Sequence, residues 1–159
     1  MQDKKSYTVD QARTLIQRYC SYRERSQKEV LKKLNDYGMH DLAKDTLLVE
    51  LIQDNFLNES RFATAYARGK FNQNHWGWNL ISKGLYNHNI SKPCMAEAKR
   101  EVLQLDYYGK ALMLTQKKWD RVSANSEYER RNKVAKYVIN KGFESSVVWE
   151  VIKDLEEMP

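Results

Sequence analysis

Apolar residues recur at the spacing of an amphipathic helix along nearly the whole chain. Val30 with Leu34 and Val134 with Val138 are examples. Residues three and four apart share one face of an α-helix, so each group marks a side that packs inward. The pattern predicts helices over residues 8–20, 26–37, 41–54, 59–74, 76–88, 92–104, 107–121, 127–141 and 145–157. No segment has the convincing alternation of a β-strand.

Capping residues stand at the ends of these predicted helices. A hydroxyl residue followed three positions later by Gln or Glu forms a capping box, and this occurs at Thr8/Gln11, Ser26/Glu29 and Ser126/Glu129. Asn58 and Ser91 are predicted as further N-caps. The residues predicted to end helices in a left-handed conformation are Gly38, Asn89 and Gly142.

The predicted turns divide the chain into three similar units. The turn residues at 38, 89 and 142 follow an aliphatic pair and precede an apolar residue in each unit. This predicts an all-α fold of three tandem three-helix repeats, over residues 8–54, 58–104 and 106–157, which form an elongated, curved array. Chance similarity among amphipathic helices is the alternative. A long helical array offers an extended surface to another polymer.

Composition is that of a folded, helical chain. Hydrophobic residues make up 42% and charged residues 30% of the 159 residues, with only 2 Pro and 6 Gly. No apolar run reaches the roughly 18 residues of a membrane span, and the N-terminus lacks the apolar core of a signal peptide. We therefore expect a cytoplasmic protein without a membrane partner, and reduced thiols at Cys20 and Cys94.

Positive charge is concentrated in the middle of the chain. Residues 61–100 contain seven basic residues and one acidic residue, so the net charge of this stretch, +6, equals that of the whole chain. The asymmetry predicts a basic central surface for an anionic partner, with an ordinary solvated face as the alternative. The side chains predicted to neutralise phosphates or pair with acids are Arg61, Arg68, Lys70, Lys83, Lys92, Lys99 and Arg100.

Two further basic clusters flank the central stretch. They add the predicted contact residues Arg23, Arg25, Lys32, Lys33, Arg130 and Arg131. Arg61 has a structural alternative, pairing with Asp54 or Glu59. Among the aromatic residues of the basic stretch, Trp78 is the one predicted to be exposed, where it could stack on bases.

No catalytic constellation is present in the sequence. The three histidines lack the paired spacing of metal ligands, and no glycine-rich phosphate loop occurs. We therefore predict that the chain is not an enzyme, with no catalytic residues, no metal and no cofactor.

Four segments, in order, resemble blocks of the RecX family of regulatory proteins. They are YRERSQKEVLKKLNDYGM (22–39), DNFLNESRFATAYARGKF (54–71), HWGWNLISKGLYNHNI (75–90) and NKVAKYVINKGF (132–143). The resemblance covers roughly residues 19–155. The chain departs from the family pattern at Asn58, where an acid is usual, at residues 78–80, where an arginine is often found, and at Asn89, which replaces glycine.

The resemblance implies that the chain is a three-repeat helical protein that binds the RecA recombinase. Proteins of this family lie in the groove of the RecA–DNA filament and inhibit strand exchange and associated activities. On this basis we expect a monomer whose partners are the RecA filament and, weakly and without sequence preference, single- and double-stranded DNA. A helical nucleic-acid-binding protein acting without RecA is the first alternative, and a scaffold that grips peptides is the second.

Overall fold

The computed structural model describes residues 6–159, and in this part of the chain all regular structure is α-helical. The helices are α1 Val9–Tyr22, α2 Gln27–Asp36, α3 Asp41–Gln53, α4 Glu59–Asn74, α5 Trp78–Asn87, α6 Lys92–Gln104, α7 Tyr107–Arg121, α8 Glu127–Asn140 and α9 Ser145–Glu157. Each predicted helix is present, with its ends within two residues of the prediction. Between residues 6 and 159, no helix combines the length and apolar character needed to cross a bilayer.

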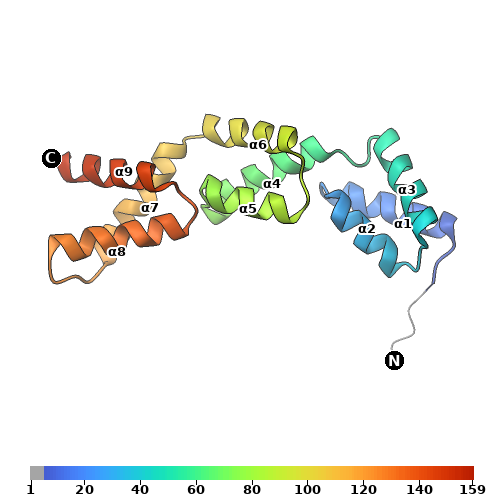
Figure 1. Ribbon diagram of the computed structural model, residues 1–159, viewed down its shortest axis with the longest axis horizontal. Coiled ribbons are helices and arrows are strands. Elements are labelled where there is room, and N and C mark those ends of the chain that lie inside the picture. Colours follow the sequence, from blue (N-terminus) through green and yellow to red (C-terminus); the bar gives the residue numbers. More distant parts are fainter. Residues whose placement is uncertain (1–5) are drawn as a thin grey trace, which may run out of the picture.

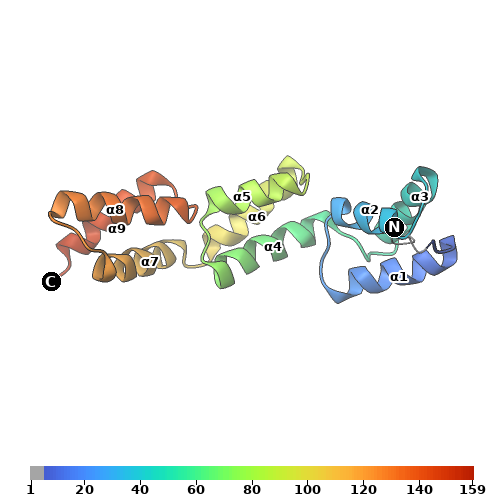
Figure 2. The ribbon, with the colours of Figure 1, turned by 90° about the horizontal axis from the view of Figure 1, so that it is seen from below.

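The helices form three consecutive groups along one long axis (Figures 1 and 2). We call α1–α3 repeat 1, α4–α6 repeat 2 and α7–α9 repeat 3. The first helix of each repeat packs with the third, and α1 and α9 lie toward opposite ends of the array. The predicted all-α, elongated arrangement is confirmed.

Capping bonds fix where the helices begin. The boxes at Thr8 and Ser26 are complete, because each side chain accepts from the third helical residue and receives a side chain on its own backbone N–H. Ser126 forms only half of its box, since Glu129 accepts from the backbone of Asn125 instead. Asn58 caps α4, whereas Ser91 precedes α6 without a side-chain cap bond.

The three predicted turn residues all have positive φ. Gly38, Asn89 and Gly142 have φ of +82°, +59° and +101°. The residue after each one is buried: Met39, Ile90 and Phe143. The left-handed residue therefore ends the second helix of each repeat and turns the next apolar side chain into the core.

Two separate hydrophobic cores lie in the described chain. One belongs to repeat 1 and includes Ile16, Leu34 and Leu51, together with Leu57 from the linker that follows α3. The other runs without interruption through repeats 2 and 3, from Phe62 to Ile152. Repeats 2 and 3 thus form one packing unit, and repeat 1 is the other.

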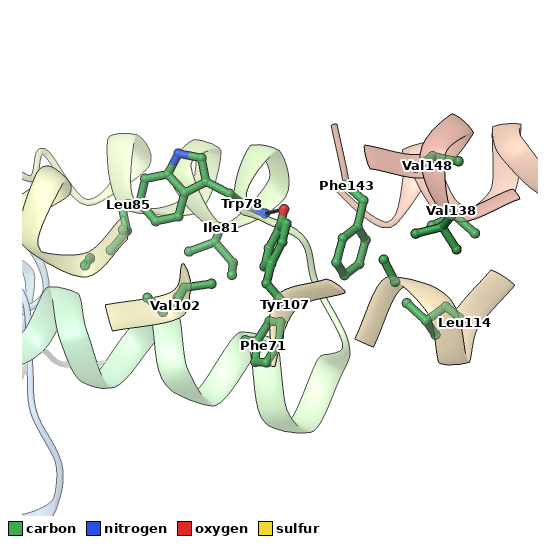
Figure 3. Packing of buried hydrophobic residues seen from close by; sticks show 14 of the residues in the cluster. Phe71, Trp78, Ile81, Leu85, Val102, Tyr107, Leu114, Val138, Phe143 and Val148 are labelled. Carbon is green, nitrogen blue, oxygen red and sulfur yellow. Dashed lines mark hydrogen bonds between the residues drawn. The ribbon is translucent and has the colours of Figure 1, made fainter. Parts of the chain in front are cut away.

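Aromatic rings and backbone contacts join repeats 2 and 3. The ring of Tyr107 lies 5.9 Å from that of Phe71 and 5.1 Å from that of Phe143 (Figure 3). Its hydroxyl accepts from the backbone N–H of Trp78 at 2.9 Å and donates to Glu144. A Cβ on Gly77 would lie 2.4 Å from Phe143 N, so only glycine permits this close approach.

Candidate functional site

The exposed basic side chains of repeat 2 that form no salt bridge in the described chain lie on α5 and α6. Lys83 is exposed on α5, and Lys92, Lys99 and Arg100 are exposed on α6. Within residues 6–159, none of these four forms a salt bridge. Lys92 and Lys99 are seven residues apart, so they share one side of α6. These side chains are available to an anionic partner.

The other central basic residues are engaged with neighbouring side chains. Arg68 donates to Glu101 at 2.8 Å, across α4 and α6. Arg61 pairs with Glu24 at 2.9 Å and also donates to Asn55, which holds repeat 2 against repeat 1. Arg61 is therefore paired within the chain, and its partner is Glu24 rather than the predicted Asp54 or Glu59.

Lys70 lies against aromatic rings rather than acids. Its Nζ is 4.9 Å from the ring centre of Trp76 and 5.5 Å from that of Tyr66. It also lines a cleft of about 510 Å³ between repeats 1 and 2, together with Arg23 and His88. The seven central basic residues are thus spread over three helices and several surroundings.

Two predicted contact residues are buried. Trp78 is 8% exposed, because it begins α5 on the side that faces Ile81 and Leu85, so its predicted exposure is wrong. Arg25 is also 8% exposed. Its Nε donates to the backbone of Tyr19, and its guanidinium stacks 3.7 Å above the Tyr19 ring. Both side chains stabilise the fold from within.

The remaining basic residues of repeat 1 differ in their availability. Lys32 is exposed on α2. Arg23 pairs with Glu29 at 2.6 Å, and Lys33 lies 5.5 Å from the ring centre of Tyr19. Lys32 is therefore the predicted residue of this cluster that is most accessible to a partner.

In repeat 3 the two predicted arginines are engaged. Arg131 pairs with Glu156 across α8 and α9, which raises the pKa of its guanidinium through the hydrogen bond to that carboxylate. Arg130 stacks 5.4 Å above the ring of Trp119. These contacts hold α8 against its neighbours within the repeat.

A basic ridge on α7 was missed by the sequence analysis. It consists of Lys110, Lys117, Lys118 and Arg121, with Lys141 nearby at the end of α8. Net charge counted along the sequence does not reveal this ridge, because the acids of α8 and α9 cancel its charge over the whole of repeat 3. Counting charge by helix face would have found it, since 110, 117 and 121 fall on one side of a helix.

Polar side chains join repeats 1 and 2. Ser26 Oγ lies 2.9 Å from His88 Nδ1, and Lys28 Nζ donates to the backbone oxygen of Asn87 at 2.7 Å. Burial lowers the pKa of His88, while the nearby carboxylate of Glu29 opposes that shift. Burial raises the pKa of Glu29, but hydrogen bonds from Ser26 and Arg23 outweigh it and leave that pKa below its ordinary value.

The described residues offer charge and an extended shape to a partner. Between residues 6 and 159, no group of three or more His, Cys, Asp or Glu side chains could hold a metal ion. Both cysteines are free thiols, and burial raises the pKa of Cys20 to about 11. The arrangement can neutralise a long anionic partner at several points.

Two family models match most of the second and third repeats. The first, described as RecX, second three-helix domain, matches residues 58–98. The second, described as RecX, third three-helix domain, matches residues 106–152. Together they cover more than half of the chain.

Curated relatives with the same family name match across nearly the whole chain. Regulatory protein RecX of Bacillus cytotoxicus is 24% identical over 139 residues, which are 87% of this chain and 52% of the relative. The RecX of Oceanobacillus iheyensis is 24% identical over 149 residues, 94% of this chain and 55% of the relative. The chain therefore spans about half the length of the curated relatives it matches.

Solved RecX structures share the fold. The crystal structure of RecX from Lactobacillus salivarius superposes with a TM-score of 0.82 and 23% identity, covering 94% of this chain and 97% of that one. A second structure, of a regulatory protein RecX, has a TM-score of 0.82 and 25% identity, covering 92% and 71%. The elongated three-repeat arrangement is shared with these proteins.

Proposed function

The chain belongs to the RecX family of regulatory proteins, and we propose that it binds the RecA recombinase filament on DNA and damps its activity. The activities affected are strand exchange and the associated ATP hydrolysis and coprotease function. We place this role in the bacterial cytoplasm, in homologous recombination, DNA repair and the SOS response. The chain acts as a monomer and as a regulator rather than an enzyme.

The elongated array of three repeats is the observation that carries this proposal (Figure 1). Consecutive helical repeats present a long surface, which suits a partner that is itself a polymer. A compact globule of the same length would reach only a short part of a filament.

Exposed cations supply the electrostatic part of the proposed contact. Among the predicted contact residues, those that are exposed and form no salt bridge in the described chain are Lys32 in repeat 1 and Lys83, Lys92, Lys99 and Arg100 in repeat 2. Few and scattered phosphate contacts give weak binding to DNA alone, which falls with added salt and does not select a sequence. The filament is the preferred partner because protein contacts add to these charges.

RecA-driven ATP hydrolysis on single-stranded DNA tests the proposal. We expect the chain to reduce the rate, and reversal of three exposed cations, Lys83→Glu, Lys92→Glu and Arg100→Glu, to abolish most of that inhibition. The free energy of unfolding should change by less than about 1 kcal/mol, because exposed charges contribute little to stability.

A matched triple reversal separates a specific surface from net charge. Arg18, Lys136 and Lys153 are also exposed, and changing them to Glu alters the net charge equally. We expect this control to keep inhibiting RecA. Equal loss in both triples would contradict a specific contact surface, and a wild-type chain that leaves ATP hydrolysis unchanged in several-fold excess would contradict the proposal itself.

Nucleic-acid binding without RecA is the alternative that the same samples test. The helix–turn–helix around Gly38, between α2 and α3, is the feature that favours it. Tight, sequence-selective binding to free DNA in moderate salt would support it. The RecA proposal expects weak, unselective binding.

A further inference from the structure

We propose that the junction of repeats 2 and 3 contains a phosphate-binding site formed by His75, Lys110 and Lys141. Lys117 and Arg121 continue this site along α7, and its ligand is the backbone of a single nucleic-acid strand. The proposal rests on the proposed function and deepens it, because it names a further part of the chain that touches DNA. Its test needs no RecA.

Three elements bring the site together. His75 follows α4 in a left-handed conformation with φ of +57°, which turns its ring toward α7. Lys110 Nζ, in the first turn of α7, donates to His75 Nδ1 at 2.9 Å. Lys141 Nζ, after α8, donates to the backbone oxygen of Asn74 at 3.1 Å. The packing of repeat 3 on repeat 2 thus places two ammonium groups around the end of α4.

Positive charge at this place is not balanced by carboxylates. No salt bridge to Lys110, Lys117 or Lys141 is found in the part of the chain that the structure describes. The acids of the same junction are used elsewhere: Asp106 caps α7 and Glu144 accepts from Tyr107. Cations held together without acids repel one another, and a bound anion would remove that repulsion.

The pKa of the His75 ring responds to this positive charge. Its pKa is lowered by burial and by Lys110, Lys141 and Lys117, and each of these charged groups acts in the same direction. Lysine ammonium groups only donate hydrogen bonds, so Nδ1 accepts and the proton of the neutral ring is on Nε2. An anion bound between the lysines would favour the protonated ring and raise the pKa again.

The ridge on α7 extends the site in one direction. Residues 110, 117 and 121 are seven and four positions apart, so their side chains project from one side at axial intervals of about 10.5 and 6 Å. A small groove of about 180 Å³ lies beside them and is lined by Leu114, Lys117, Lys118, Arg121 and Tyr137. The ridge therefore provides successive cations rather than a single pocket.

An aromatic side chain beside the ridge favours a single strand over other anions. Tyr137 is 38% exposed, and Lys118 Nζ lies 4.8 Å from its ring centre. Proteins that bind single strands combine cations along the backbone with aromatic rings on which bases stack. A duplex offers no unstacked base to such a ring, and an acidic peptide offers none at all.

Proton NMR of the three histidines, with a short oligothymidylate and no RecA, tests the site. We expect the pKa of His75 to rise when the strand binds, while that of His88, at the other junction, stays nearly constant. Binding should accordingly tighten as the pH falls, because protonation and anion binding favour each other. His75→Asn, which tolerates the left-handed conformation, assigns the signal.

An unchanged His75 pKa at saturation with the oligothymidylate would overturn the proposal. A polyglutamate peptide that raises this pKa, where the oligothymidylate does not, would also overturn it and assign the lysines to an acidic protein segment. Either result leaves the inhibition of RecA to be judged by the ATP hydrolysis assay, so the two proposals can fail separately.

Salt dependence of oligothymidylate binding supplies a second readout. Lys117→Gln with Arg121→Gln removes two phosphate contacts. The fall of log affinity with log salt should therefore become less steep, by about 1.4 in slope. Lys136→Gln with Lys153→Gln removes the same charge from exposed positions on α8 and α9, and should leave the slope nearly unchanged. Equal slopes for the two double variants would contradict the ridge as the binding surface.

Discussion

The two junctions between repeats are built from different chemistry. Repeats 2 and 3 meet through rings and backbone, with Tyr107 between Phe71 and Phe143 and the backbone N–H of Gly77 donating to Lys141 O at 2.8 Å. Repeats 1 and 2 meet through polar side chains, as in the pair Arg61–Glu24. Repeat 2 thus shares a hydrophobic core with repeat 3, whereas it is joined to repeat 1 by polar contacts.

This difference determines which parts of the molecule unfold together. The continuous core of repeats 2 and 3 loses large apolar areas if either repeat opens, and burial of that kind dominates stability. The polar contacts at the other junction are partly exposed and worth about 1 kcal/mol or less each. We therefore expect repeats 2 and 3 to unfold as one unit and repeat 1 as another.

Phe143→Ala should have the largest effect. The ring is fully buried at the fused junction, so its removal should cost about 3–5 kcal/mol and destabilise repeats 2 and 3 together. Hydrogen exchange should show lost protection in α4–α9, with α1–α3 nearly unchanged.

Leu34→Ala is the matched change in the other core. Leu34 is also fully buried, and its loss should cost about 2–5 kcal/mol but lower protection mainly in α1–α3. If both variants lowered protection along the whole chain, the molecule would be a single cooperative unit and the distinction between the junctions would fail.

Arg61→Ala should have an intermediate effect of about 1 kcal/mol. It removes the pair with Glu24 and two hydrogen bonds to Asn55, at a side chain that is 38% exposed. Because these contacts bridge the polar junction, the distance distribution between fluorophores on repeats 1 and 2 should broaden.

Arg68→Ala is the control for this change. Arg68 pairs with Glu101 inside repeat 2, so its loss should leave the distances between repeats 1 and 2 unaltered. The same broadening in both variants, or in neither, would show that Arg61 does not hold the junction.

Local signals explain why the helices could be predicted. Capping and turn chemistry act within a few residues, so Thr8, Ser26, Gly38 and Gly142 have the roles their positions suggest. The box at Ser126 is incomplete because two backbone N–H groups can donate to the Glu129 carboxylate, and the one that does so belongs to Asn125 rather than Ser126. A pattern of two residues does not reveal such a competitor.

Surface availability could not be predicted in the same way. Trp78 lies between Gly77 and Asn79 in the sequence but starts a helix whose first turn faces Tyr107, twenty-nine residues later. Arg25 stacks on Tyr19 because the chain reverses between α1 and α2. The ridge on α7 is visible only when charge is counted by helix face. Tertiary contacts, not composition, decide which cations reach solvent.

Acidification should have the smallest effect, and at the polar junction it acts through His88. The pKa of His88 is lowered by burial, so below its ordinary value near 6.5 the unfolded chain takes up the proton first and stability falls. Glu29, whose pKa is also lowered, stays charged until lower pH.

Between about pH 7 and about pH 5, the urea midpoint of repeat 1 and its junction should therefore fall more in the wild type than in His88→Gln. The exposed His40→Gln should behave like the wild type, and an identical pH response in the His88 variant would show that this ring does not link protons to the junction.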